Sequence, residues 1–212
     1  MKIKFTLLFV AAVLFFSACK KSDTPKTTTP AITATYYFQG TLNGQVTTWQ
    51  ITDGVTGYVT GSSANITSNQ NVVTGGLTAS VSAAAGLVPQ IGIEFRTFQF
   101  DNSQGVPTTY FDGFVNTGDW TFATTSTYTA GTKAIAVYYT DSQGNAYSSI
   151  GAQSGSSANV ISVSQVAATL FTNESLQIKL TFNCILYPVS GTGSNITLTN
   201  GQASVLLEDL LY

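Results

Sequence analysis

A strict alternation of apolar and polar residues near the C-terminus constrains the fold more than any other feature of the sequence. From Gln177 to Leu186 the apolar positions are Ile178, Leu180, Phe182, Cys184 and Leu186, and the polar ones are Gln177, Lys179, Thr181 and Asn183. A period of two residues places one face of a segment on a core and the other face in water. We therefore expect a half-buried β-strand here, with Cys184 packed as a small core residue.

Short runs rich in β-branched and aromatic residues, separated by turn residues, predict further strands. They cover residues 36–38, 46–51, 57–67, 71–82, 90–100, 109–116, 120–128, 133–140, 146–151, 160–166, 175–186, 195–199 and 202–207. Asn43-Gly44 and Asn200-Gly201 each lie between two such runs, and an Asn-Gly pair in that place predicts a hairpin. Only residues 163–176 have a pattern that suits a short helix.

These elements predict an all-β protein, and we expect an antiparallel two-sheet β-sandwich, with a closed β-barrel as the alternative. One strand has a mixed pattern. Ile91, Ile93 and Phe95 share one face, whereas Phe98 and Phe100 have the opposite parity. Either a β-bulge near Arg96-Thr97 returns both groups to one face, or both faces of this strand are covered.

The composition excludes one class of partner. From Ala31 onward the only cations are Arg96, Lys133 and Lys179, against nine carboxylates, which gives a net charge of −6. Such a surface repels phosphate backbones, so nucleic-acid binding through a basic footprint is excluded. Only 8% of the residues are charged and 43% are hydrophobic. Neutral polar residues replace the missing charges, as in many secreted β proteins.

The first residues have the three-part layout of a secretory signal. Lys2 and Lys4 precede an apolar run at residues 5–16, and Ser17-Ala18-Cys19 follows. The run is shorter than the roughly 20 residues that a membrane-spanning helix needs. We expect a signal peptide at 1–18, a tether rich in Thr, Pro and Lys at 19–30, and a single folded domain at 31–212.

Phe16-Ser17-Ala18-Cys19 resembles a bacterial lipobox, which implies that Cys19 carries fatty acyl chains such as palmitate and becomes the N-terminus. Together with the Thr/Pro tether and an all-β body, Cys19-Lys20-Lys21-Ser22-Asp23 resembles small lipoproteins of the Bacteroidota. The patterns at 180–184 and 196–201 are similar to the closing strands of members without an assigned activity. The resemblance implies anchoring in the outer membrane, with the body facing either the periplasm or the medium.

Chemistry that depends on histidine is excluded because the chain contains none. It therefore has no Ser-His-Asp set and no Cys-His pair, and the usual ligands of zinc and copper are missing. A carboxylate pair remains for acid–base work, as in glycosidases, with Glu94, Asp112 and Glu174 as candidates. No spacing in the sequence brings two of them together, so we expect no catalytic residue and no enzymatic activity.

Two Asp-led turns begin at Asp101 and Asp141. Their oxygen-rich side chains suit calcium, but neither turn has the full EF-hand spacing. Asx turns, in which the Asp side chain binds its own backbone, explain both without a metal. We therefore expect no cofactor and keep the two aspartates as weak calcium candidates.

The aromatic residues give the best functional lead. Trp49, Trp120, Tyr110 and Tyr139 lie in or beside predicted strands. Exposed rings of this kind stack on sugars or on a partner protein, but the same residues also fill sandwich cores. We expect a lipid-anchored, non-enzymatic envelope protein that binds a glycan or a protein. The alternatives are a structural or assembly subunit working through sheet edges, a carboxylate-dependent glycosidase, and a lipid carrier with a hollow barrel.

Overall fold

The computed structural model describes residues 30–52, 57–69, 71–101, 103, 110–129, 131–168 and 174–211. Ala31–Tyr212 form one compact unit, whereas residues 1–29, with the expected signal peptide, Cys19 and most of the tether, lie outside the described residues. The strands are β1 (Tyr36–Leu42), β2 (Gln45–Ile51), β3 (Tyr58–Asn69), β4 (Val72–Ala83), β5 (Gln90–Asp101), β6 (Gly118–Asp119), β7 (Ala134–Thr140), β8 (Ala146–Ser148), β9 (Ser157–Val166), β10 (Ser175–Pro188) and β11 (Ile196–Glu208). Within the described ranges, no helix has the length and apolarity needed to cross a membrane.

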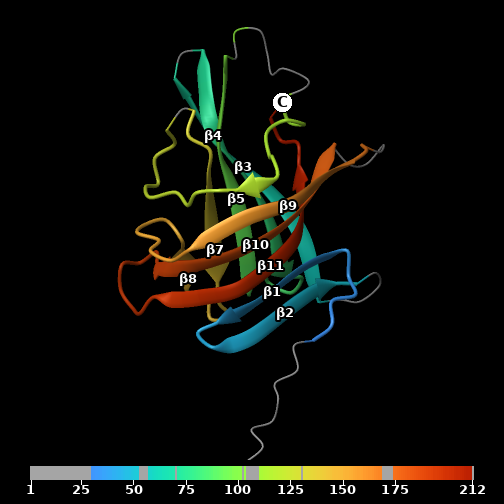
Figure 1. Ribbon diagram of the computed structural model, residues 1–212, viewed down its shortest axis with the longest axis vertical. Coiled ribbons are helices and arrows are strands. Elements are labelled where there is room, and N and C mark those ends of the chain that lie inside the picture. The colour runs from blue at the N-terminus through green and yellow to red at the C-terminus, as the bar shows by residue number, and fades with distance from the viewer. Residues whose placement is uncertain are drawn as a thin grey trace, which may run out of the picture. The chain divides into compact units, whose positions relative to one another are not determined.

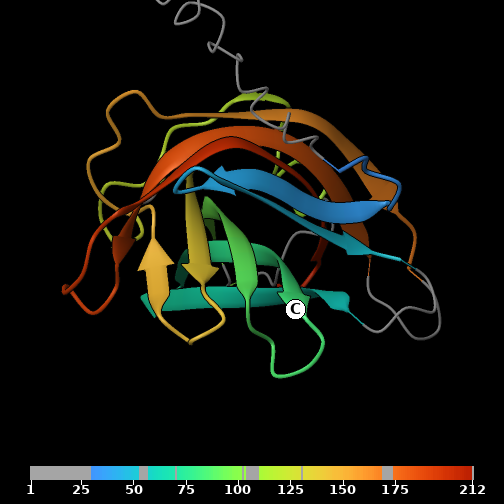
Figure 2. The same cartoon turned by 90° about the horizontal axis from the view of Figure 1, so that it is seen from below.

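The strands form one strongly curled antiparallel sheet, a half-barrel (Figures 1 and 2). The order is β2-β1-β11-β10-β8-β7-β5-β4-β3, and β9 and β6 extend the sheet beside β10. The all-β prediction is confirmed. The two halves that face each other in Figure 2 are joined where β10 pairs with β8, so they do not form two separate sheets. The end strands β2 and β3 do not pair with each other, so no closed barrel forms.

The alternating segment forms β10, as predicted. Leu180, Phe182 and Leu186 are buried in the core between the two halves of the sheet. Cys184 lies among them, with only 2% of its surface exposed. Burial raises the pKa of its thiol to about 12, because the thiolate would lose its hydration there. Cys184 is therefore a core residue.

The mixed pattern of β5 has both of its expected causes. Gly75 of β4 pairs with Phe98 and Gly76 pairs with Arg96, so Thr97 is the extra residue of a β-bulge. The bulge turns Phe98 and Phe100 into the same core as Ile91, Ile93 and Phe95. The opposite face of β5 is covered as well, since Glu94 and Arg96 are also buried.

One of the two predicted hairpins is confirmed and the other is wrong. Asn43-Gly44 joins β1 to β2 in a two-residue loop with positive φ at both positions. Asn200-Gly201 lies inside β11, where the pairing with β10 shifts register between Phe182 and Cys184. The Asn183 side chain accepts a hydrogen bond from the backbone N–H of Asn200 at 2.7 Å. This contact with the neighbouring strand makes a bulge where the sequence alone indicates a turn.

Three further predictions fail for a tertiary reason. Residues 110–115 are turns, and residues 120–129 form a strap with a single bridge, between Phe122 and Ile135. The strap bonds to β7 through its backbone at Thr121 and Ala123, and side chains of β5 hold its later residues, as described below. No helix begins at Val163, because residues 163–166 pair with β10 as the end of β9. Residues 169–173 lie outside the described part of the chain.

Gly201 provides a test of the bulge in β11. A Cβ atom there would lie 2.6 Å from the carbonyl oxygen of Phe182 and 2.7 Å from the Cδ2 atom of Leu198. We expect Gly201→Ala to lower the free energy of unfolding by about 1–3 kcal/mol, the usual cost of overpacking. Gly113→Ala is the control, since nothing lies within 4 Å of its Cβ position. Urea denaturation measures both variants, and equal stabilities would contradict the close approach at Gly201.

Candidate functional site

The structure brings together two of the four aromatic residues predicted to bind a ligand. The Trp49 ring stacks on Tyr139 with 6.3 Å between ring centroids, and on Tyr58 with 5.5 Å. Tyr147 continues the stack from Tyr139 at 5.9 Å. Trp49 is 5% exposed and belongs to the main core. Its ring is in contact with the rings of Phe38, Tyr58 and Tyr139, so this stack joins β2, β3, β7 and β8 as a packing element.

Tyr110 lies in a different place, in the turns that precede β6. Its hydroxyl accepts a hydrogen bond from the backbone N–H of Gln99 at 2.7 Å. Its ring meets Phe100 edge-on at 5.4 Å and Phe114 at 6.5 Å. These contacts fix the turn at 110–115 against β5.

Trp120 lines an open depression of about 300 Å³. The lining residues are Asn116, Thr117, Asp119, Trp120, Thr121 and Lys133. Trp120 is 8% exposed. One side of its ring packs edge-on against Phe95 at 5.5 Å, and its indole N–H donates to the Asn116 carbonyl at 2.9 Å. The volume is at the lower end of the range for small-molecule sites.

Backbone pairing on both sides of Trp120 positions this depression. Before Trp120, β6 pairs with β9, and the Trp120 N–H itself donates to Ala158 at 2.9 Å. After Trp120, the carbonyl of Thr121 accepts from the N–H of Ile135 in β7 at 2.8 Å. The segment around Trp120 thus pairs first with β9 and then with β7. The pairing with β7 brings Lys133, which directly precedes that strand, beside the indole.

The rim of the depression carries groups of both charges. The Lys133 ammonium is 5.9 Å from the centroid of the Trp120 ring and donates to the Phe114 carbonyl at 3.2 Å. Asp119 accepts a hydrogen bond from the Asn159 side chain at 2.7 Å. Within the described part of the chain the one ion pair is between Arg96 and Glu94, so Lys133 and Asp119 are not paired with each other. Both keep hydrogen-bonding capacity toward the depression.

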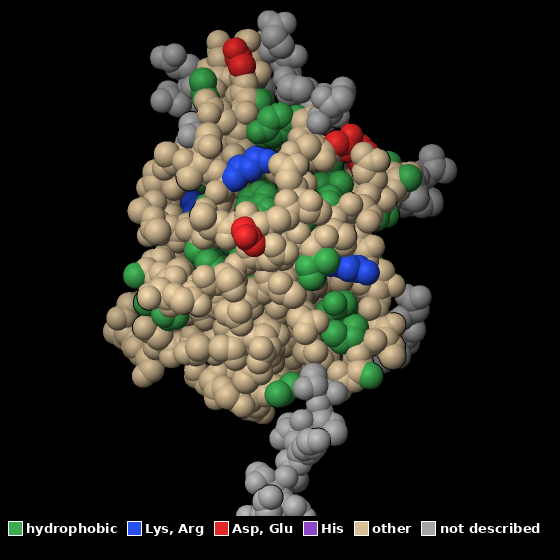
Figure 3. All heavy atoms as spheres, viewed as in Figure 1, with side chains coloured by type: hydrophobic (Ala, Val, Ile, Leu, Met, Phe, Trp, Pro, Cys, Tyr) green, Lys and Arg blue, Asp and Glu red, His purple; other side chains and the backbone are tan. Residues whose placement is uncertain are grey.

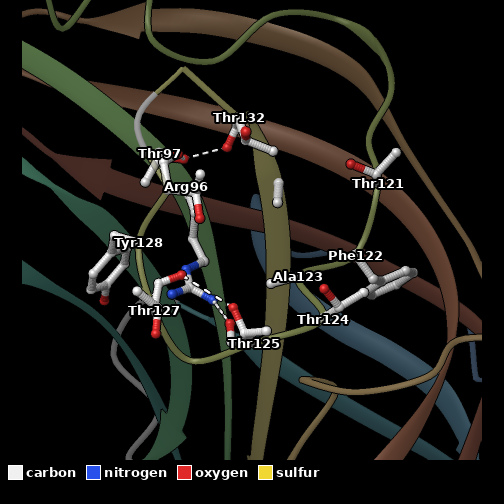
Figure 4. Close-up of a pocket in the computed structure, with 12 residues that line it drawn as sticks. Arg96, Thr97, Thr121, Phe122, Ala123, Thr124, Thr125, Thr127, Tyr128 and Thr132 are labelled. Carbon is white, nitrogen blue, oxygen red and sulfur yellow. Dashed lines mark hydrogen bonds between the residues drawn. The ribbon is translucent and has the colours of Figure 1, made fainter.

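A second, smaller depression of about 100 Å³ lies under the strap and shares Thr121 with the first. Figure 4 shows Arg96 pointing toward the strap at Thr125, with Thr97 turned toward Thr132. The Arg96 guanidinium donates to the carbonyls of Thr125 at 2.9 Å and Ser126 at 2.5 Å. It also lies 4.3 Å from the centroid of the Tyr128 ring. Arg96 therefore fastens the strap to β5.

Glu94 anchors this arrangement. It is fully buried, and its carboxylate accepts hydrogen bonds from the hydroxyls of Tyr128 at 2.6 Å and Tyr138 at 2.8 Å. The Arg96 Nε atom is 3.4 Å from the second carboxylate oxygen. Burial raises the pKa of Tyr128 and of Tyr138, and the negative charge of Glu94 raises it further, so both phenols are neutral donors.

The three carboxylates considered for glycosidase chemistry lie in different environments. Glu94 is enclosed by the two tyrosines and Arg96. Asp112 is exposed in the turn at 110–115, and Glu174 directly precedes β10. The closed surroundings of Glu94 fit a structural role.

Both calcium candidates form the expected Asx turns. Asp101 accepts a hydrogen bond from the N–H of Ser103, which lowers the pKa of its carboxyl. Asp141 accepts hydrogen bonds from the side chain and the N–H of Asn145 and from the N–H of Gln143. These bonds, that of the Asn145 side chain above all, lower its pKa. In the described ranges no group of three or more His, Cys, Asp or Glu residues is placed to hold a metal ion.

Of the lining residues the sequence analysis predicted only Trp120, and it missed Asn116, Thr117, Asp119, Thr121 and Lys133. For Lys133 a signal was present, since it is one of only three cations after Ala31. The face in Figure 3 is mostly neutral and polar, with few charged side chains. Asn116 and Thr121 belong to abundant residue types and gave no such signal.

Comparisons with family models, with curated proteins and with solved structures found no match for this chain. The candidate site therefore rests on its geometry alone.

The ion pair under the strap can be tested by breaking one side of it. Glu94→Gln leaves the Arg96 guanidinium buried without a carboxylate, and we expect the free energy of unfolding to fall by about 3–5 kcal/mol. In Glu94→Gln/Arg96→Met the unpaired charge is gone, so a large part of that loss should be recovered. Urea denaturation measures the stability of both variants. If Glu94→Gln is as stable as the wild type, the role assigned to the ion pair is contradicted.

Proposed function

We propose that this protein is a non-enzymatic binding module of the bacterial envelope, anchored by lipid at Cys19, and that it binds a glycan in the depression at Trp120. The single observation that carries the binding proposal is the combination of an indole with Lys133, Asp119 and Asn116 around one open depression. The lipobox-like ending at Cys19 and the resemblance to small Bacteroidota lipoproteins support the location, which we take to be the outer membrane.

The lining fits a sugar better than an apolar ligand. A sugar presents hydroxyl groups that both donate and accept hydrogen bonds, together with an apolar ring face. Lys133 supplies donors, Asp119 supplies acceptors, and Thr121 supplies a hydroxyl that does both. The Trp120 indole lines the same depression and offers an apolar surface that is polarised toward C–H and cationic groups. A purely apolar ligand would leave these polar groups unpaired, which is costly.

The curled sheet supports this function by holding the site rigid. Trp120 packs on Phe95 in β5, and the flanking backbone pairs with β9 and β7. A site supported by strands on both sides binds with a smaller ordering cost than one on a free loop. We infer that the two halves of the sheet act as the two layers of the sandwich expected from the sequence.

Binding is tested on a glycan array, followed by titration of any sugar that binds. We expect Trp120→Phe and Lys133→Met to weaken binding by roughly tenfold each, equivalent to about 1.4 kcal/mol. Trp49→Phe is the matched control, because it changes an indole in the core stack and not in the depression. The proposal fails if no glycan binds, or if Trp49→Phe weakens binding as much as Trp120→Phe at equal folded stability.

Anchoring is tested separately through Cys19. Each buried methylene contributes about 0.8 kcal/mol, and two or more acyl chains give stable attachment. We expect Cys19→Ala to move the protein from the membrane to the soluble fraction of lysed cells, with Cys184→Ala remaining in the membrane. Mass spectrometry of the wild-type N-terminal peptide should show acyl chains on Cys19. A Cys19→Ala variant that still sediments with membranes would contradict lipid anchoring.

A further inference from the structure

Strand β3 forms one edge of the curled sheet. The hydroxyl of Ser62 touches β11, where it donates to the Leu206 carbonyl at 3.1 Å and accepts from the Glu208 N–H at 3.0 Å, but β3 carries none of the usual protection against strand pairing. It has 12 residues and pairs with β4 along its whole length, from Tyr58 opposite Ala83 to Asn69 opposite Val72, without a register shift. Among the described strands, none pairs with its other side. The strand contains no Lys, Arg, Asp, Glu or Pro. Natural edge strands normally carry a charge, a proline or a bulge, because a regular bare edge pairs with other strands.

The edge at the opposite end of the sheet differs. Strand β2 has only seven residues. Its Gln50 side chain accepts from the N–H of Thr33 at 2.8 Å and donates to the Ala31 carbonyl at 3.1 Å. The segment before β1 is thereby fastened to β2. On β3, by contrast, Val59 and Ile66 are 38% and 50% exposed.

We propose that β3 is a homotypic pairing edge, where a second copy of this chain adds its own β3 in antiparallel orientation across a two-fold axis. Such a pairing is isologous, so each backbone donor of one copy meets an acceptor of the other. Two-fold pairing also sets residues of the same strand opposite one another. All the residues of β3 are uncharged, with Thr, Ser and Asn the most frequent, so no like charges meet.

Charge favours a second copy at this edge over other faces of the molecule. From Ala31 onward the chain has a net charge of −6, so two copies repel each other through most approaches. The uncharged strip of β3 is a long surface on which they can meet without opposing carboxylates. This inference does not depend on glycan binding, since β3 contributes no residue to the depression at Trp120.

Cysteine cross-linking of the full chain, produced with its own leader, tests the proposal. Ser63 and Thr67 lie on β3 with exposed side chains, whereas Cys184 is buried and does not interfere. Ser63→Cys and Thr67→Cys are treated in isolated membranes with an oxidant or a short bismaleimide. Thr47→Cys, on the β2 edge, is the control. We expect a covalent dimer from at least one β3 variant, shown by mass spectrometry to contain two copies of this chain, and none from Thr47→Cys.

A second variant keeps the test decisive. Adding Thr67→Lys to Ser63→Cys gives β3 the kind of charge that protects natural edge strands from pairing, so the dimer should be lost while the urea unfolding midpoint stays that of Ser63→Cys. The proposal is overturned if no β3 position gives a dimer, if Thr47→Cys gives as much dimer, if Thr67→Lys leaves the dimer in place, or if β3 cross-links to a different protein.

Discussion

The ion pair between Glu94 and Arg96 fastens the strap that follows Trp120 to β5. It lies on the face of β5 opposite the main core, where a charge without a partner would be strongly unfavourable. The two tyrosine hydroxyls satisfy the carboxylate, and the strap carbonyls satisfy the guanidinium. Every member of the network therefore has a partner, which makes the arrangement specific as well as stable. Trp120 and Lys133 are held near each other independently of this network, because Thr121 accepts from the Ile135 N–H at 2.8 Å and donates to the Lys133 carbonyl at 3.3 Å.

Local patterns in the sequence predicted most of the strands of the fold. The period of two in β10 and the Asn43-Gly44 loop depend on neighbours in sequence, and both were predictable. The bulge at Thr97 was also visible, because a change of parity within an apolar strand has few explanations. The Asn200-Gly201 pair could not be assigned, since Asn-Gly suits both a hairpin and a bulge. The contact that decides between them comes from Asn183, on another strand.

The candidate site was predictable only in part. Trp120 was recognised by its residue type, but Trp49 is of the same type and lies in the core stack. What separates them is the pairing of the segment around Trp120 with β9 and then with β7, which no local pattern encodes. Residues 120–129 have a strand-like composition, yet Arg96, distant in sequence, holds them as a strap. Hydrogen bonds from a side chain to the backbone here replace the hydrogen bonds between paired strands, and they produce no periodic pattern in the sequence.

The buried thiol of Cys184 can report how often the sheet opens around β10. A thiol reagent attacks the thiolate, and the enclosed side chain with its raised pKa offers almost none while β10 stays in place. Labelling then proceeds only as often as β10 opens between its neighbours. The chain has one other cysteine, Cys19, so labelling is read from the peptide that contains Cys184. The rate of modification would report how frequently the centre of the sheet opens, without any engineered probe.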